Sequence, residues 1–148
     1  MMTAPGGRKL KQITEGFVKQ QTIKWLNRHK WKIVSVKEKA EHGVDITACK
    51  IGYSRYYLIE AKGDPGKVKF PRSVRDNSFL NALGQILTRM NTQAGYYYGV
   101  ALPKSYERLV FERIPWQVCK KLKLNFFLVD ENGKVRHLTW KAIKDSTP

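Results

Sequence analysis

The chain has 148 residues, the length of one domain, and its 28 Lys and Arg residues against 12 Asp and Glu give a formal net charge of +16. Such a charge opposes compaction by self-repulsion unless a polyanion neutralises it, so the composition favours a nucleic-acid partner. No apolar run approaches the ~20 residues of a membrane span, and no secretory signal is visible, which argues against a membrane-spanning protein and predicts a cytoplasmic one. Cys49 and Cys119 lack paired spacing, which argues against a disulfide framework and a zinc site.

The first predicted element is a long amphipathic helix. Residues 1–9 are predicted to form a flexible N-terminus, and residues 10–148 are assigned to a single domain. A basic amphipathic helix over residues 8–30 can also lie on an anionic membrane, but that alternative leaves the rest of the chain unexplained. Apolar residues recur at the spacing of one helix face at Leu10, Ile13, Phe17, Val18, Trp25 and Leu26.

Three successive strands are predicted next, over residues 31–36, 44–51 and 55–62. The tripeptide Gly52-Tyr53-Ser54 is a turn signal that joins the second strand to the third in a hairpin. The segment 63–66, Gly-Asp-Pro-Gly, ends the third strand. These three elements are expected to form a meander.

A basic loop is predicted over residues 67–75, followed by helix caps at residues 76–78 and then by a helix. The flank of this helix, with Ala82, Gln85 and Arg89, is expected to turn toward a functional site. The apolar stripe of the helix is Phe79, Leu83, Ile86, Leu87 and Met90.

The remaining elements are a buried strand at 96–101, helices beginning at Pro103 and Pro115, and a strand at 125–129. A hairpin-type turn at 130–133 leads into a strand at 134–138, and the tail from Thr139 is predicted to be helical. This order predicts an α/β fold with a mixed central β-sheet flanked by helices, αβββαβ in its core. The connection from the third strand to the fourth is expected to be a right-handed crossover.

The segment EHGVDITACKIGYSRYYLIEAKGD, residues 41–64, carries the chemistry. Glu60 and Lys62 lie two residues apart in a strand and therefore project from the same face. Asp45 on the paired strand can bring its carboxylate within metal-bridging distance of Glu60. Two carboxylates without a nearby imidazole or thiolate suit a hard ion such as Mg²⁺ or Mn²⁺.

An isolated Glu-x-Lys is more often an ordinary salt bridge on a solvated strand. Here the neighbours change that interpretation, because Leu58 and Ile59 precede the motif and Val44 and Ile46 flank the aspartate. Charges beside a buried sheet pay a desolvation cost that favours a functional role.

The sequence resembles the PD-(D/E)XK, or restriction-endonuclease-like, nuclease superfamily, and in particular its Mrr-like and Holliday-junction-resolvase-like members. The paired motifs are GVDI at 43–46 and LIEAKG at 58–63, with a hairpin between them. Val44 stands where the family name has Pro, as in many members. The resemblance extends to a first helix with Glu15 on its apolar border and to NALGQILTRM at 81–90, and residues 101–135 are more loosely similar to uncharacterised prokaryotic members.

The resemblance implies that Asp45, Glu60 and the carbonyl of Ala61 ligate the metal. It implies that Lys62 orients the attacking water or stabilises the developing negative charge, a role that agrees with the chemistry of an ammonium group. Glu15 is expected either to hold a second metal or its bound water, or simply to complement the helix dipole in the first turn.

Gln85 is expected to hydrogen-bond a phosphate or to orient Lys62, with a plain surface position as the alternative. A group of basic residues close to the motif is interpreted as contacts to DNA phosphates rather than as a solvated loop, and these contacts fix position without reading sequence. The group is Lys67, Lys69, Arg72, Arg75 and Arg89.

Two further sets of residues are given structural interpretations. His29, His42 and His137 are scattered and form no metal-binding pattern. The run Tyr96 to Tyr98 resembles a base-stacking platform, but it leads a predicted core strand and is interpreted as packing.

The leading hypothesis is a metal-dependent DNA endonuclease that hydrolyses phosphodiester bonds, of a restriction, repair or junction-resolving kind. The alternative is a catalytically inactive nucleic-acid-binding module of the same fold. A basic RNA-associated structural protein ranks third, because it explains the charge and not the paired carboxylates. One site per chain means that cutting both strands of a duplex would need a homodimer.

Overall fold

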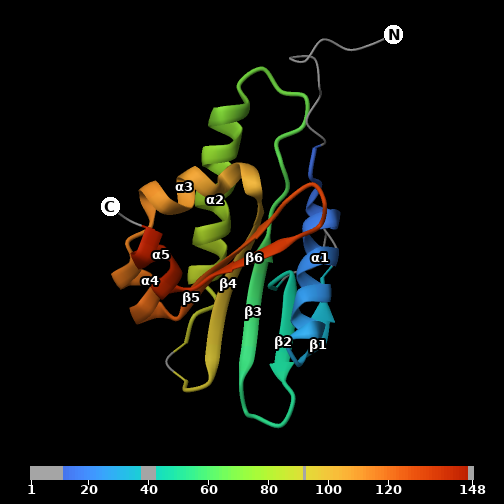
Figure 1. The fold of residues 1–148 in the computed structure, drawn as a ribbon, viewed down its shortest axis with the longest axis vertical. Helices are drawn as coiled ribbons and strands as arrows, with labels where there is room; N and C mark the ends of the chain where they lie inside the picture. Colours follow the sequence, from blue (N-terminus) through green and yellow to red (C-terminus); the bar gives the residue numbers. More distant parts are fainter. Residues whose placement is uncertain (1–11, 38–42, 92, 147–148) are drawn as a thin grey trace.

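The computed structural model describes residues 12–37, 43–91 and 93–146, and its centre is one six-stranded sheet in the order β1-β2-β3-β4-β5-β6 (Figure 1). Strands β3, β4 and β5 run parallel, and the other neighbouring pairs are antiparallel, so the predicted mixed sheet is confirmed. The strands are β1 (Trp31–Val36), β2 (Ile46–Lys50), β3 (Tyr56–Ala61), β4 (Tyr96–Pro103), β5 (Leu124–Val129) and β6 (Val135–Leu138).

Helices cover both faces of this sheet, as predicted. Helix α1 (Glu15–Arg28) packs on one face, where Ile59 and Phe127 are fully buried. The other face carries a larger core around Phe79, Val100 and Phe126. Its helices are α2 (Pro71–Leu87), the short 3-10 helix η2 (Lys104–Tyr106), α3 (Glu107–Arg113), α4 (Trp116–Leu122) and α5 (Trp140–Ser146).

Helix α1 begins later than the predicted helix. Thr14 caps it, and the Thr14 hydroxyl accepts a hydrogen bond of 3.1 Å from the backbone N–H of Phe17. Ile13 is buried outside the helix because its carbonyl accepts from the N–H of Asp64 at 2.8 Å. Leu10 and the predicted flexible segment 1–9 lie outside the described residues, as does His42.

Helix α2 begins earlier than predicted, so the prediction of a basic loop up to residue 75 was wrong. Pro71 occupies the first helical turn, where its fixed φ suits the helix and its missing N–H costs nothing. Arg72 and Arg75 therefore lie on the helix, and residues 76–78 lie inside it rather than capping it.

The buried face of α2 also differs from the predicted stripe. Phe79, Ala82 and Ile86 are buried at three- and four-residue spacing, whereas Leu87 is 49% exposed. Ala82 thus belongs to the core and not to the flank. Leu83 and Met90, also in the predicted stripe, are partly buried against the same core.

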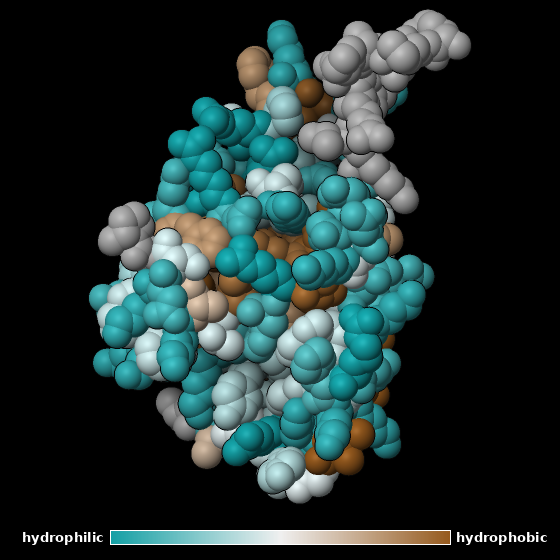
Figure 2. All heavy atoms as spheres, viewed as in Figure 1, coloured by the Kyte–Doolittle hydropathy of each residue, from teal (hydrophilic) through white to brown (hydrophobic). Residues whose placement is uncertain are grey.

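The later elements follow the prediction closely. Helices come after Pro103 and Pro115, and the turn before β6 is held by the Asp130 carboxylate, which accepts from the N–H groups of Asn132 and Lys134 at 2.9 Å each. Hydrophilic side chains cover most of the face seen in Figure 2. None of the described helices is long and apolar enough to cross a membrane.

Candidate functional site

The hairpin of β2 and β3 brings the two predicted carboxylates together. Ile46 pairs with Ile59, so Asp45, just before β2, lies beside Glu60 near the end of β3. The Asp45 Oδ2 atom accepts a hydrogen bond of 2.7 Å from the backbone N–H of Ala61. The Asp45 carboxylate is therefore fixed at the edge where the parallel strands end.

Glu60 is buried, with 4% of its surface exposed, on the face of the sheet that α2 covers. Burial raises the pKa of Glu60 to about 8, and the charge of Asp45 and a hydrogen bond to it act in the same direction. In the metal-free protein at neutral pH, the Glu60 carboxyl therefore holds a proton against Asp45.

Two cations reach this pair from different elements. Lys62 follows β3, and its backbone N–H donates to the carbonyl of Ala101 at 3.0 Å. Arg89 follows α2 and is exposed. The positive charges of both side chains act on Glu60 and lower its pKa, although burial and Asp45 outweigh them. The structure thus brings Asp45, Glu60, Lys62 and Arg89 together.

A third cation, Lys19, was not foreseen. Its ammonium lies 3.5 Å from Asp45 Oδ1 and 3.4 Å from Glu15 Oε2, and it donates to the carbonyl of Lys37 at 3.1 Å. The Lys19 side chain is only 13% exposed. An ammonium therefore joins Glu15 to Asp45, and Glu15 lies in the first turn of α1, as the helix-dipole alternative expects. A role of Glu15 at a second metal stays a prediction. The four-residue spacing of Glu15 and Lys19 was the available signal.

Gln85, in contrast, is not brought into contact with the pair. Its side chain is exposed on α2, and within the described part of the chain it forms no hydrogen bond. Its backbone carbonyl accepts a hydrogen bond of 2.7 Å from the Thr88 hydroxyl. The predicted role of Gln85 remains a prediction.

The loop after Lys62 is clamped from two sides. Gly63 accepts a hydrogen bond of 2.9 Å at its carbonyl from the Tyr106 hydroxyl, and the Ser105 hydroxyl donates to the Asp64 carboxylate. The other carboxylate oxygen of Asp64 accepts from the N–H of Ile13 at 3.0 Å. These contacts connect the loop to the start of α1 and to η2, and so fix the backbone next to the site.

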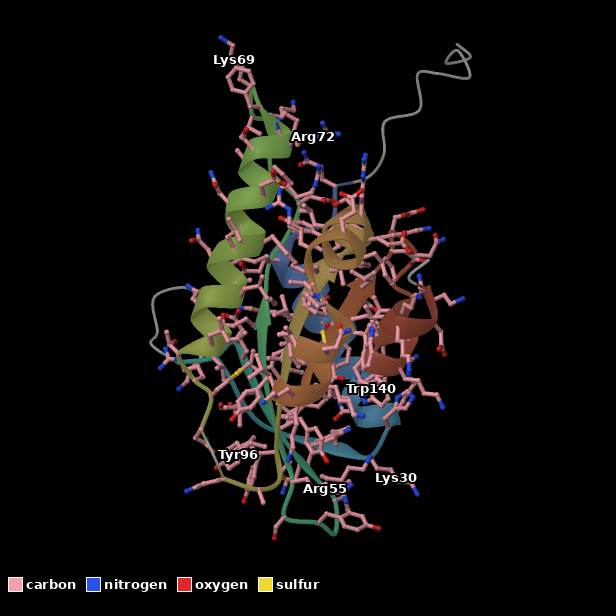
Figure 3. All side chains as sticks on the ribbon, turned by 90° about the vertical axis from the view of Figure 1, so that its left-hand side faces the viewer. Lys30, Arg55, Lys69, Arg72, Tyr96 and Trp140 are labelled. Atoms are coloured by element: carbon pink, nitrogen blue, oxygen red, sulfur yellow. The ribbon has the colours of Figure 1, made fainter. Side chains whose placement is uncertain are left out.

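The predicted phosphate-binding residues divide into two groups. Lys67 and Lys69 are exposed in the loop, and Figure 3 shows Lys69 and Arg72 at the end of the molecule opposite Arg55. Arg72 and Arg75 line a cavity of about 290 Å³, which also takes in Ser105 of the clamp. Two arginines of α3, absent from the prediction, line the same cavity; they are Arg108 and Arg113.

This arginine cavity contains more positive than negative side chains. Arg113 lies 3.8 Å from Asp76, and Arg108 donates to Glu112 at 2.7 Å, so two of the four arginines are paired. The Arg75 guanidinium lies 5.8 Å from the centre of the Tyr106 ring, and its Nε is buried without a hydrogen-bond partner among the described residues. Anionic oxygens would satisfy such a donor.

No protein-family model matches the chain, and no curated protein matches its sequence. Among solved structures, an XisH family protein from Nostoc punctiforme PCC 73102 is 17% identical with a TM-score of 0.54, over 83% of this chain and 98% of that protein. An fdxN element excision controlling factor protein from Anabaena variabilis is 14% identical with a TM-score of 0.49, over 84% of this chain and 98% of its own. The first likeness shows that the α/β fold is shared.

The donor set of the carboxylate pair fits a divalent cation. Asp45 and Glu60 supply hard oxygen atoms, and burial, reinforced by the charge of Asp45, keeps a proton on Glu60. Among the described residues no three His, Cys, Asp or Glu side chains group closely enough to hold a metal, so the remaining donors would have to be backbone carbonyls, such as that of Ala61, and water.

The proton on Glu60 predicts a pH-dependent stability difference between the wild type and Glu60→Gln without metal. Below pH 4.5 the glutamate is neutral in both folded and unfolded chains. As pH rises toward 8, only the unfolded chain ionises, so the wild type loses stability. Glu60→Gln lacks this loss, so its stability relative to the wild type should rise by roughly 2–3 kcal/mol between pH 4.5 and pH 8 after solvent screening.

Chemical denaturation in chelator at pH 4.5, 6 and 8 measures this difference. The advantage of Glu60→Gln should grow with pH over that range. Equal stability differences at all three pH values would mean that Glu60 ionises normally and that Asp45 does not act on it.

Proposed function

We propose that the chain is a metal-dependent DNA endonuclease whose site is built from Asp45, Glu60 and Lys62. The observation that carries the proposal is the buried Glu60 carboxyl beside Asp45, with a lysine two residues further along the same strand end. Burying two carboxyl groups beside a sheet carries a desolvation penalty, and a bound divalent cation would offset it.

Asp45 and Glu60 would hold Mg²⁺ or Mn²⁺, with the Ala61 carbonyl as a further oxygen. The ion would supply Lewis-acid stabilisation of the phosphoryl oxygens and lower the pKa of water. The N–H of Ala61 holds one oxygen of Asp45 in place, at 2.7 Å, and the Lys19 ammonium lies 3.5 Å from the other. These two contacts orient Asp45 without occupying every lone pair of its carboxylate.

The positive charges of Lys62 and Arg89 act on Glu60 and lower its pKa. Negative charge develops on the phosphoryl oxygens during phosphodiester hydrolysis, and a fixed cation stabilises it. Lys62 is the better placed for this role, because it is half-buried and its backbone is bonded to β4, whereas Arg89 is exposed.

The proposed substrate is DNA because basic side chains continue away from the carboxylate pair. The loop with Lys67 and Lys69 leads into α2, whose Arg72 and Arg75 line the arginine cavity. Phosphate contacts of this kind position a nucleic acid without reading its sequence. The charge of +16 agrees with such a partner.

The test is incubation of the purified chain with plasmid, single-stranded and four-way-junction DNA, each with Mg²⁺, Mn²⁺ or chelator. Cleavage of at least one substrate that requires metal is the expected result. Binding without cleavage under every condition would favour a catalytically inactive DNA-binding module. One observation favours the inactive module: the Lys19 ammonium already gives Asp45 a cationic partner in place of a metal ion.

DNA binding should weaken steeply with salt, because each phosphate contact releases condensed counterions. If the loop and the arginine cavity together neutralise six or more phosphates, affinity should fall on the order of 10³-fold between 50 mM and 200 mM salt. Fluorescence anisotropy with a labelled duplex, in chelator to prevent cleavage, measures this dependence. An affinity that hardly changes over this range would contradict binding through the basic residues.

A further inference from the structure

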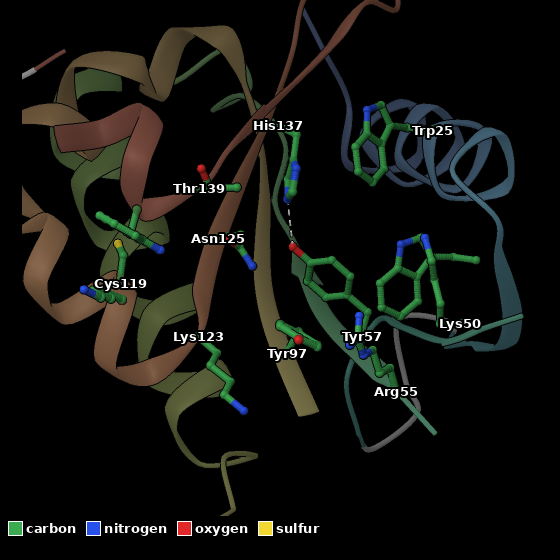
Figure 4. Close-up of a pocket in the computed structure, with 13 residues that line it drawn as sticks. Trp25, Lys50, Arg55, Tyr57, Tyr97, Cys119, Lys123, Asn125, His137 and Thr139 are labelled. Carbon is green, nitrogen blue, oxygen red and sulfur yellow. Dashed lines mark hydrogen bonds between the residues drawn. The ribbon is translucent and has the colours of Figure 1, made fainter. Parts of the chain in front are cut away.

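A second pocket lies on the face of the sheet opposite Glu60. Strand alternation directs Tyr57 toward α1, and Glu60, three residues on, toward α2. The pocket has a volume of about 390 Å³ and opens between α1 on one side and α4 and α5 on the other (Figure 4). It shares no lining residue with the carboxylate pair.

The walls of this pocket are aromatic. Trp25, Trp31, Tyr97 and Trp140 line it together with Tyr57. The Trp31 ring stands edge-on to both Tyr57 and Tyr97, with ring centres 5.1 and 6.5 Å apart. Rings of this kind offer faces and edges on which a flat heteroaromatic ligand can stack.

The rim of the pocket is cationic, and none of its described lining residues is acidic. Lys50 lies 5.0 Å from the centre of the Trp31 ring, and Lys123 lies 5.5 Å from that of Tyr97. Arg55 from the β2–β3 hairpin and Lys120 of α4 complete the set. An anionic group above the aromatic walls would meet several positive charges at once.

The floor is polar but uncharged. The Tyr57 hydroxyl and Nε2 of His137 are hydrogen-bonded at 3.0 Å, and Figure 4 shows Asn125 beside them. Burial, with the charge of His29, lowers the pKa of His137 to about 4, so its imidazole is neutral at physiological pH. An amide, a neutral imidazole and a phenol match the hydrogen-bonding edge of a nucleobase better than a second phosphate.

The backbone at Lys123 adds an independent observation. This residue ends α4 in the left-handed region, with φ 55° and ψ 41°, a position where glycine is the favoured residue. A lysine there carries a conformational cost that its contact with Tyr97 alone hardly offsets. Lys30 also has a positive φ, and what distinguishes Lys123 is that it lines the pocket.

We propose that this pocket binds a single nucleoside 5′-phosphate, with the base among the aromatic walls and over the neutral floor, and the phosphate at the cationic rim. The volume fits one nucleotide and not an extended chain. The nucleotide is either a free molecule or an unpaired nucleotide of DNA, since both present the same chemistry. The site does not depend on the carboxylate pair and stands without the proposed nuclease activity.

Binding to the full-length chain is tested by calorimetry and by quenching of tryptophan fluorescence, because Trp25, Trp31 and Trp140 line the pocket. The probes are the four 2′-deoxynucleoside 5′-monophosphates, the matching nucleosides, deoxyribose 5-phosphate and inorganic phosphate. At least one monophosphate should bind at least tenfold more tightly than its nucleoside and than deoxyribose 5-phosphate. Equal binding of inorganic phosphate and the best monophosphate would overturn the proposal, since the aromatic walls would then contribute nothing.

Lys123→Gly is the decisive variant, with Lys30→Gly as its matched control. Both lysines have positive φ, so each change relieves the backbone and removes one positive charge, but only Lys123 lines the pocket. Neither variant should melt at a lower temperature than the wild type. Lys123→Gly should weaken monophosphate binding roughly tenfold, and Lys30→Gly should leave it within about twofold. Equal losses in both variants would mean non-specific attraction and would refute the site.

The two sources of the nucleotide are separated with oligonucleotides in chelator. If the occupant is an unpaired nucleotide of DNA, a duplex with one unpaired base should compete with the monophosphate better than the fully paired duplex, and Lys123→Gly should remove that preference. If the occupant is a free nucleotide, both duplexes should compete equally poorly. Failure of every monophosphate to bind at millimolar concentration would overturn the proposal for both sources.

Discussion

Glu60→Gln is expected to abolish metal-dependent DNA cleavage while leaving DNA affinity within a few fold of the wild type. Gln keeps the size of the side chain and a hydrogen-bond donor toward Asp45, but it cannot supply a carboxylate to a metal ion. Loss of one such group costs on the order of 10²-fold or more in rate. The denaturation of the same variant, measured at the pH of the cleavage assay, separates lost activity from lost folding.

Lys62→Ala should likewise abolish cleavage and leave DNA affinity within a few fold, because it removes only one of many cations from the proposed DNA-binding surface. Lys24→Ala, an exposed lysine on α1, controls for the loss of a single positive charge. Single-turnover cleavage and anisotropy on the same DNA measure both quantities. If Glu60→Gln and Lys62→Ala cut at the wild-type rate, the activity belongs to other residues or to a contaminant.

The carboxylate pair was within reach of sequence reasoning because its geometry depends on two local rules. Strand alternation placed Glu60 and Lys62 on one face, and a short hairpin fixed which residue of β2 lies beside Glu60. The mixed α/β sheet followed from the order of elements. Each inference needed only residues close together in the chain.

Errors arose where tertiary contacts decided the local structure. Asp64 fixes Ile13 outside α1, and nothing in residues 10–20 alone signals that contact. Lys19 lies between Glu15 and Asp45 because α1 packs across the start of β2, which spacing alone does not establish. The early start of α2 is different, since Pro71 was a visible helix-start signal that the basic residues around it obscured.

The aromatic pocket could not be read from the sequence for the same reason. Its residues come from α1, β1, the β2–β3 hairpin, β4, α4, β5, β6 and α5, and Trp25 and Trp140 are about 115 residues apart in the chain. His137 and Tyr57, which form its floor, are 80 residues apart in the chain. In the sequence, therefore, the histidines were only scattered residues without a metal-binding pattern, and Tyr96 to Tyr98 were interpreted as packing.

Gly63→Ala is expected to lower both stability and cleavage rate, although Gly63 carries no functional group. A Cβ atom at this position would overlap the backbone nitrogen of Glu15 and lie 2.9 Å from the carbonyl carbon of Thr14. Both neighbours are backbone atoms at the capped start of α1, so they can move only if the helix moves. Overpacking of this kind costs about 1–3 kcal/mol, and a rigid backbone neighbour favours the upper end.

Moving Gly63 and the start of α1 apart would displace two parts of the candidate site. Gly63 follows Lys62 directly, and Glu15 leads the helix whose Lys19 contacts Asp45. A shift of about 1 Å in such groups can cost on the order of 10²-fold in rate.

Gly66→Ala, in the same loop, is the matched control because a Cβ there meets no atom within 4 Å. The melting temperature and the single-turnover cleavage rate of Gly66→Ala should match those of the wild type, and both should be clearly lower for Gly63→Ala. Equal behaviour of the two variants would mean that the loop and α1 are not packed as closely as described, and that the position of Lys62 does not depend on their contact.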